Sequence, residues 1–222
     1  MDLTRTAQLV SDATRLPLLA IPLFFVVGVS AAGWGGLLWA VLCLLLTSGL
    51  SLVYLAYLVR TGQVRDPRKI TQQERVWPLL VVALLHAGAW VLVTLLEAPA
   101  PLRAVLLSYA LASGAFALLT PLLNVSLHMA GVAGASVCLI FILGAWGALL
   151  TPILPLVWWA RTVLERHTTL ELALGTLVGG GLTWVAFHFV VGSGLAVAGY
   201  FLRRLAFPIA GVPMQWCESC RL

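Results

Sequence analysis

Long apolar runs alternate with short polar segments along almost the whole chain. Each of the longer runs approaches the roughly 20 residues that a helix needs to cross a bilayer. The predicted spans are residues 16–32, 34–59, 77–96, 104–122, 130–148 and 168–191, with a shorter helix after Pro152 and Pro155 that leads to Arg161. We therefore predict an all-α protein, a polytopic transmembrane bundle of about six to seven spans, forming one domain over residues 16–205.

The two ends of the chain have different patterns. Residues 1–15 place Leu3, Ala7, Val10 and Ala13 among polar residues, which predicts a short amphipathic helix at the membrane surface. We expect no cleavable signal peptide, because the first apolar run is long and lacks a small-residue cleavage site. Residues 206–222 are interpreted as a tail. Their C-E-S-C pair, Cys217 and Cys220, could bind metal or form a disulfide, although an incidental role is favoured.

Composition supports the membrane prediction. The chain has 222 residues, of which 61% are hydrophobic and 9% charged, whereas soluble domains carry about 25% charged residues. The net charge is +5, but the basic residues are clustered. Clustering of this kind in a membrane protein indicates topology or an anionic ligand, and no nucleic-acid partner is expected.

Three polar clusters are predicted to share one membrane face. They are residues 60–76, residues 124–128 and residues 161–171. Two predicted crossings separate each cluster from the next, so the chain returns to the same side each time. The three clusters can therefore form a single composite site.

The clusters together carry the groups that phosphate chemistry requires. Guanidinium groups match phosphate oxygens in geometry and charge. One histidine can attack phosphorus while another protonates the leaving oxygen. The candidate residues are the cations Arg68, Lys69, Arg75 and Arg161, the neutral Ser126, and His128 and His167 with Glu171.

The pair His167 and Glu171 is spaced four residues apart. On a helix this spacing places both on one face, where the carboxylate can hold one ring nitrogen and leave the other free to react. No carboxylate cluster for Mg²⁺ is present, and two histidines with one glutamate, without H-E-x-x-H spacing, are too few for zinc. We therefore expect no metal and no other cofactor.

These residues resemble the motifs of the type-2 phosphatidic acid phosphatase (PAP2) superfamily, the membrane lipid phosphatases related to vanadium haloperoxidases. The family motifs are Lys-x6-Arg-Pro, Pro-Ser-Gly-His and Ser-Arg-x5-His-x3-Asp. The third is matched by Arg161, five residues, His167, three residues and Glu171, and the second by Val125-Ser126-Leu127-His128. The first is matched by Arg68, six residues and Arg75, with Lys69 offset by one position. The chain departs from the motifs at Leu127, Ala160, Glu171 and Pro78.

The resemblance implies a haloperoxidase-like core and a role for each matched residue. His167 would be the nucleophile that forms a phosphohistidine, Glu171 would orient it, and His128 would be the general acid. The phosphate would be held by the remaining matched residues, Arg75, Arg161, Ser126 and Arg68 or Lys69.

We therefore expect a metal-independent, multi-pass phosphatase of the cell membrane. Its substrate would be a lipid phosphate or pyrophosphate, of phosphatidate or polyprenyl type, met among the membrane lipids; a homo-oligomer is left open. The alternatives are a transporter or a non-catalytic scaffold that binds an anion at the same face. His167 with Glu171 could also be a structural pair at a helix start, and Arg161 an interfacial anchor.

Overall fold

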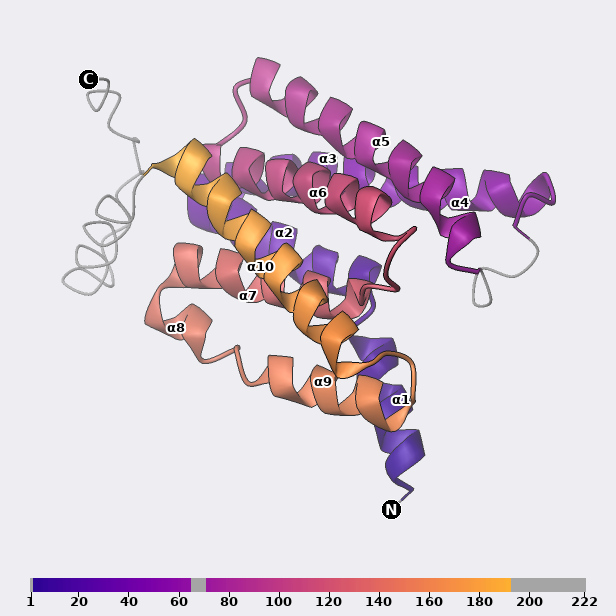
Figure 1. Ribbon diagram of the computed structural model, residues 1–222. Helices are drawn as coiled ribbons and strands as arrows, with labels where there is room; N and C mark the ends of the chain where they lie inside the picture. Colours follow the sequence, from indigo (N-terminus) through magenta and orange to yellow (C-terminus); the bar gives the residue numbers. More distant parts are fainter. Residues whose placement is uncertain (1, 65–70, 193–222) are drawn as a thin grey trace.

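The computed structural model describes residues 2–64 and 71–192, and every regular element in these ranges is helical (Figure 1). This confirms the all-α prediction. Arg68, Lys69, Cys217, Cys220, the predicted tail and the end of the predicted domain lie outside the described residues. The described elements, in chain order, are α1 (Leu3–Ala13), α2 (Leu16–Ala32), η1 (Gly33–Gly35), α3 (Gly36–Leu44), the π-helix η2 (Leu45–Gly49), α4 (Leu50–Arg60), η3 (Gln73–Arg75), α5 (Val76–Leu95), α6 (Ala100–Leu119), α7 (Leu127–Leu143), α8 (Ala145–Ala148), α9 (Ile153–Val163) and α10 (Thr169–Val191).

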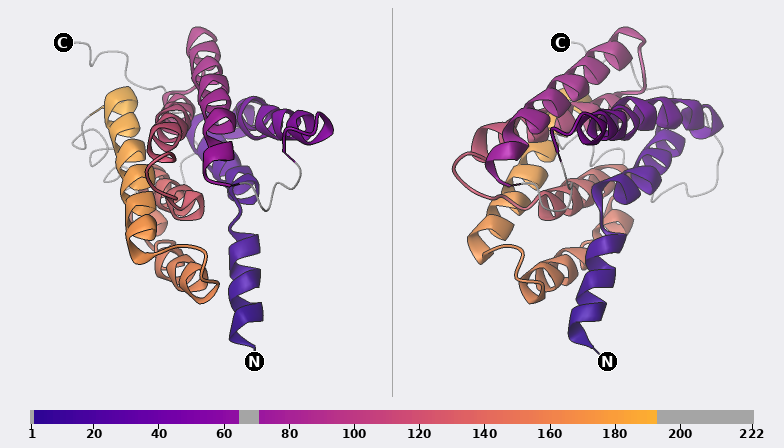
Figure 2. Two further views of the ribbon diagram at one scale, coloured as in Figure 1. Left: turned by 45° about the vertical axis from the view of Figure 1, so that its right-hand side comes forward. Right: turned by 90° about the vertical axis from the view of Figure 1, so that its right-hand side faces the viewer.

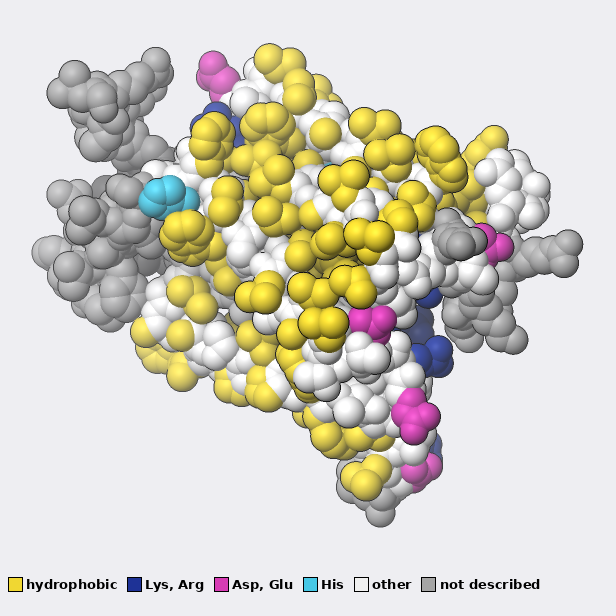
Figure 3. Space-filling model, viewed as in Figure 1, with side chains coloured by type: hydrophobic (Ala, Val, Ile, Leu, Met, Phe, Trp, Pro, Cys, Tyr) yellow, Lys and Arg dark blue, Asp and Glu magenta, His cyan; other side chains and the backbone are white. Residues whose placement is uncertain are grey.

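Among the described residues, four helical stretches are long and apolar enough to cross a membrane: Leu16–Arg60, α5, α6 and α10. Helix α7 is also apolar but has only 17 residues. In Figure 3, hydrophobic side chains cover the middle of the visible face, and the charged side chains lie toward its opposite edges. Such an apolar surface is typical of contact with lipid. The chain is thus a multi-pass membrane protein.

The stretch Leu16–Arg60 folds back on itself at a glycine-rich turn. Gly33 has φ +57° and ends α2. On the two sides of this turn, a Cβ on Gly28 or on Gly36 would collide with the backbone of the other, so only glycine allows this approach of α2 and α3. The stretch therefore holds two antiparallel helical segments, α2 and the continuous helix Gly36–Arg60, at the places predicted for the first two spans.

One polar side chain inside the apolar part, His86, has hydrogen-bonding partners on two neighbouring helices. His86 of α5 lies 3.2 Å from the Ser113 hydroxyl of α6 and 3.5 Å from the Ser51 hydroxyl of α4. Hydrogen bonds of this kind hold helices together in lipid. His86 is thereby accounted for as a structural residue.

Helices α7 and α10 pack closely through small residues. A Cβ added to Gly175 would lie 2.5 Å from the carbonyl oxygen of Ser126, and one added to Gly179 would overlap the Ala130 backbone. The Ser126 N–H also donates to the Glu171 carbonyl at 3.2 Å. This contact fixes the start of α7 against the first turns of α10.

The segment from α7 to α9 differs from the prediction of one span over residues 130–148 followed by a shorter helix. Helix α7 ends at Leu143 because Gly144 adopts φ +61°, so the helix predicted to reach Ala148 stops earlier. Helix α9 has 11 residues, about 16 Å at 1.5 Å per residue, which is shorter than the hydrocarbon core. The chain returns through α8 and α9 together.

Helix α1 extends away from the bundle beside α9 (Figures 1 and 2). Its small residues Ala7 and Ser11, with Thr14 just after the helix, are buried, whereas Leu3 and Leu9 are exposed. The buried side of α1 contacts the helix that carries Arg161. The N-terminal segment is therefore positioned to contribute to the predicted site.

Candidate active site

Asn124 joins three segments that are far apart in the sequence. Its side-chain oxygen accepts a hydrogen bond from Arg75 Nη1 at 3.2 Å, and its backbone oxygen lies 3.0 Å from His167 Nδ1. Arg75 precedes α5, Asn124 precedes α7, and His167 lies between α9 and α10. These two bonds bring the ends of the predicted clusters together at one end of the bundle.

The hydrogen bonds of His167 determine its tautomer. A carbonyl oxygen can only accept, so Nδ1 carries the proton and Nε2 keeps its lone pair. Glu171 Oε2 lies 3.4 Å from the same Nδ1, farther than the Asn124 carbonyl. The ring of His167 is thus oriented chiefly by the Asn124 backbone carbonyl, which the sequence did not reveal. The Glu171 carboxylate is a second, more distant partner of the same nitrogen.

Glu171 also begins helix α10. Its Oε2 accepts from the Thr168 N–H at 2.9 Å, and the Thr168 hydroxyl accepts from the Glu171 N–H at 3.3 Å. This reciprocal pair is a capping box. Glu171 therefore fixes the turn that holds His167 as well as lying beside its ring.

The surroundings of His167 favour the neutral ring. Burial and the positive charge of Arg161 lower its pKa, and the Glu171 carboxylate offsets part of this effect. A lower pKa keeps Nε2 unprotonated at neutral pH. The ring is consequently in the form that a nucleophile requires.

Helix α1 contributes Ser11 to the site. The Ser11 hydroxyl accepts from Arg161 Nη1 at 3.0 Å, and the Ser11 backbone lies near the His128 ring. Arg161 and His167 lie close enough for their charges to act on His128. Sequence reasoning missed Ser11; the available signal was the small residues Ala7 and Ser11 on one helical face.

Several buried polar atoms in the cluster lack a hydrogen-bond partner among the described residues. They are Ser126 Oγ, His128 Nε2 and Arg161 Nε, three of the five such side-chain atoms in the described part of the chain. Leaving a buried polar group unpaired costs about 1–3 kcal/mol, so such atoms are rare in proteins. A hydroxyl, a protonated ring nitrogen and a guanidinium N–H can all donate to the oxygens of one anion.

The structure thus gathers Arg75, Ser126, His128, Arg161, His167 and Glu171, whereas Arg68 and Lys69 fall outside its described part. A cavity of about 370 Å³ opens beside this cluster and is lined by Thr162, Glu165, Arg166, His167, Thr168 and Glu171. The described residues contain no group of three or more His, Cys, Asp or Glu side chains that could hold a metal ion. The arrangement is suited to binding an anion next to a neutral imidazole.

Comparisons with known proteins add no further assignment. No protein-family model matches the chain, and neither a curated protein nor a solved structure matches it. The residues of the site alone carry the functional argument.

Proposed function

We propose that the chain is a lipid phosphatase of PAP2 type in the cell membrane, acting on a phosphomonoester or pyrophosphate without a metal ion. The observation that carries the proposal is the set of unpaired buried atoms on Ser126, His128 and Arg161 beside His167. Ser126 Oγ and Arg161 Nε supply donors for phosphate oxygens, and His128 Nε2 is a donor when that nitrogen is protonated. His167 supplies the nucleophile.

The proposed reaction has two steps. His167 Nε2 attacks phosphorus, so that a P–N bond forms and the P–O bond to the lipid breaks. The negative charge of the bound phosphate favours the doubly protonated ring of His128, which gives its Nε2 proton to the leaving oxygen. Water then attacks the phosphohistidine, His128 takes a proton from that water, and inorganic phosphate leaves with His167 restored. Arg75 and Arg161 stabilise the charge on the phosphoryl oxygens in both steps.

The topology supports a site at one membrane surface. Counting α2, the helix Gly36–Arg60, α5, α6, α7, the α8–α9 return and α10 as crossings gives about seven passes. By this count an even number of crossings separates Ser11, Arg75, Asn124 and Arg161 from one another, which supports a common side. A phosphate group at the membrane surface can reach such a site while its hydrocarbon chain stays in the bilayer. A lipid phosphate is therefore the substrate class that we propose.

The test is phosphate release by purified protein in EDTA from dioleoyl phosphatidate and from farnesyl pyrophosphate. Release from at least one lipid is expected. His167→Ala should abolish it, and His128→Ala should lower kcat roughly 10²–10⁴-fold, the usual range for loss of a general acid or base. His188→Ala is the matched control, because His188 is exposed near the far end of α10 and should retain full activity. Comparable release by wild type and His167→Ala would contradict the proposal.

A transporter or scaffold remains the alternative outcome of that experiment. A broken helix indicates a transporter when the break lies at the binding site. Here the break between α8 and α9 lies nine or more residues before Arg161, about 13 Å along a helix. Phosphate binding that survives both histidine substitutions, without release by wild type, would indicate that alternative.

A further inference from the structure

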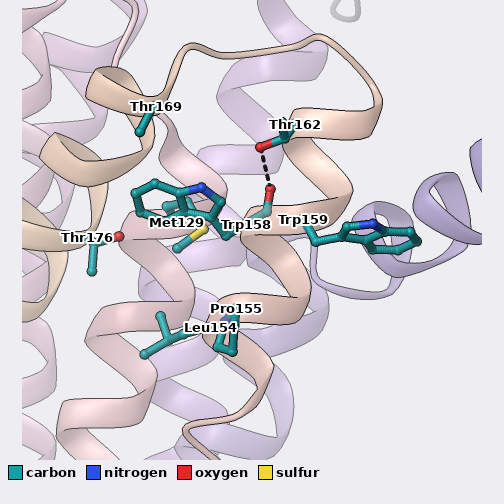
Figure 4. A pocket seen from close by; sticks show the side chains of 8 residues that line it. All are labelled: Met129, Leu154, Pro155, Trp158, Trp159, Thr162, Thr169 and Thr176. Atoms are coloured by element: carbon teal, nitrogen blue, oxygen red, sulfur yellow. Dashed lines mark hydrogen bonds between the residues drawn. The ribbon is translucent and has the colours of Figure 1, made fainter.

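A second and larger cavity of about 550 Å³ lies between α7, α9 and α10 (Figure 4). Thr162 lines both this cavity and the polar one beside His167. The two cavities are therefore neighbours that share a wall. The described residues that line the cavity beside His167 include charged ones, whereas those that line the larger cavity do not.

The lining of the larger cavity, which we call the α9–α10 groove, is apolar. Met129 forms part of it from α7, and Leu154, Pro155 and Trp158 from α9. Two of the three threonine hydroxyls that line it bond within their own helices: Thr162 donates to the Trp158 carbonyl at 3.0 Å and Thr176 to the Leu172 carbonyl at 2.9 Å. None of the described residues that line the groove is charged, so this lining offers hydrocarbon and aromatic surface to a ligand.

The packing of the helices keeps the groove open. Helix α9 packs on α1 and α7, whereas α10 packs on α7 and α6. From the turn that carries His167, α9 and α10 diverge (Figure 1). Between Leu154 and Thr162 the groove follows eight residues of α9, about 12 Å. It thus begins at the proposed active site and extends away from it.

We infer that the α9–α10 groove takes the hydrocarbon chain of the phosphorylated substrate whose phosphate lies at His167. This inference rests on the proposed function, because it identifies the other half of the same substrate. A polar cavity joined to an apolar groove matches a molecule with a phosphate at one end and a chain at the other. Lipid tails already solvate such a chain as well as protein does, so the groove acts by aligning the substrate rather than by attracting it.

The experiment compares dodecyl phosphate with butyl phosphate, which share a head group and differ in chain length. Its readout is the ratio of their kcat/KM values in detergent below the micellar concentration of dodecyl phosphate. Thr176→Trp fills the groove and should lower the ratio at least tenfold. The matched control is Leu177→Trp on the exposed side of the same helix, where Leu177 is 69% exposed, and the ratio should stay within twofold of wild type.

A binding arm separates the groove from catalysis. Dodecyl phosphate with a terminal diazirine should, after irradiation, label residues of α9 or α10 that line the groove. Thr176→Trp should lose this labelling and Leu177→Trp should keep it. Labelling of the groove without phosphate release would retain the groove and contradict the proposed function. Phosphate release with an unchanged ratio in Thr176→Trp, or with labels elsewhere, would overturn the groove and leave the function standing.

Discussion

The contact between Gly175 and Ser126 links the packing of the bundle to the chemistry of the site. A Cβ on Gly175 would lie 2.5 Å from the Ser126 carbonyl oxygen, and a Cβ contact below 3.0 Å requires something to move. The Gly175→Ala substitution must therefore displace the start of α7 by about 0.5 Å or more. That start carries Ser126 and His128.

We expect two effects from this displacement. Overpacking of a tight contact costs about 1–3 kcal/mol in the free energy of unfolding. Moving catalytic groups by roughly 1 Å can cost on the order of 10²-fold in rate, so a shift of half that size should lower kcat/KM for a lipid phosphate about tenfold. Thermal unfolding in detergent and phosphate release measure the two effects separately.

The matched control is Gly181→Ala on the same helix. Gly181 is exposed, and a Cβ there would meet no atom within 4 Å. Alanine also favours a helix by about 1 kcal/mol relative to glycine, so this variant should be at least as stable as wild type and fully active. If Gly175→Ala matched Gly181→Ala in both stability and activity, the close approach of α7 and α10 and the argument built on it would be wrong.

Two further predictions concern the groups around His167. In the proposed mechanism neutral His167 attacks phosphorus, so kcat/KM should fall as the pH drops through the pKa of His167. Arg161→Met removes a charge that lowers this pKa and should move the fall in kcat/KM to higher pH. Glu171→Gln removes a charge that raises the pKa and should move the fall to lower pH. Shifts in the same direction would contradict the electrostatic account. Ser11→Ala removes the hydrogen-bond acceptor for Arg161, and a bond to a charged group is worth about 1.5 kcal/mol or more. This variant should raise KM roughly tenfold with a smaller change in kcat, whereas Ser11→Thr should keep KM near the wild-type value. A wild-type KM in Ser11→Ala would show that α1 is not part of the site.

The helices could be predicted from the sequence because lipid leaves few alternatives. An apolar run of sufficient length must be helical, since a membrane interior offers no water to bond the backbone. The spans predicted at 77–96 and 168–191 correspond closely to α5 and α10. The end of α7 was missed because it depends on one glycine, Gly144, whose positive φ is a property of the tertiary structure.

The site was less predictable because part of it is backbone and part comes from an unexpected helix. The residue types of His128, Arg161 and His167 indicated phosphate chemistry, and parity placed them on one face. The acceptor for His167 Nδ1 is the Asn124 carbonyl, which every residue type can supply and no motif can reveal. Ser11 is an ordinary residue in an amphipathic pattern until α1 is seen beside α9.

The most direct measurement is detection of the phosphoenzyme. Wild-type protein mixed with lipid phosphate, quenched within the first turnover under alkaline conditions and digested, should yield a peptide phosphorylated on His167 in mass spectrometry, and the label should disappear when substrate is exhausted. His167→Ala should give no phosphopeptide. Turnover by wild type with no phosphate on His167 at any time point, or with phosphate on another residue, would contradict the account.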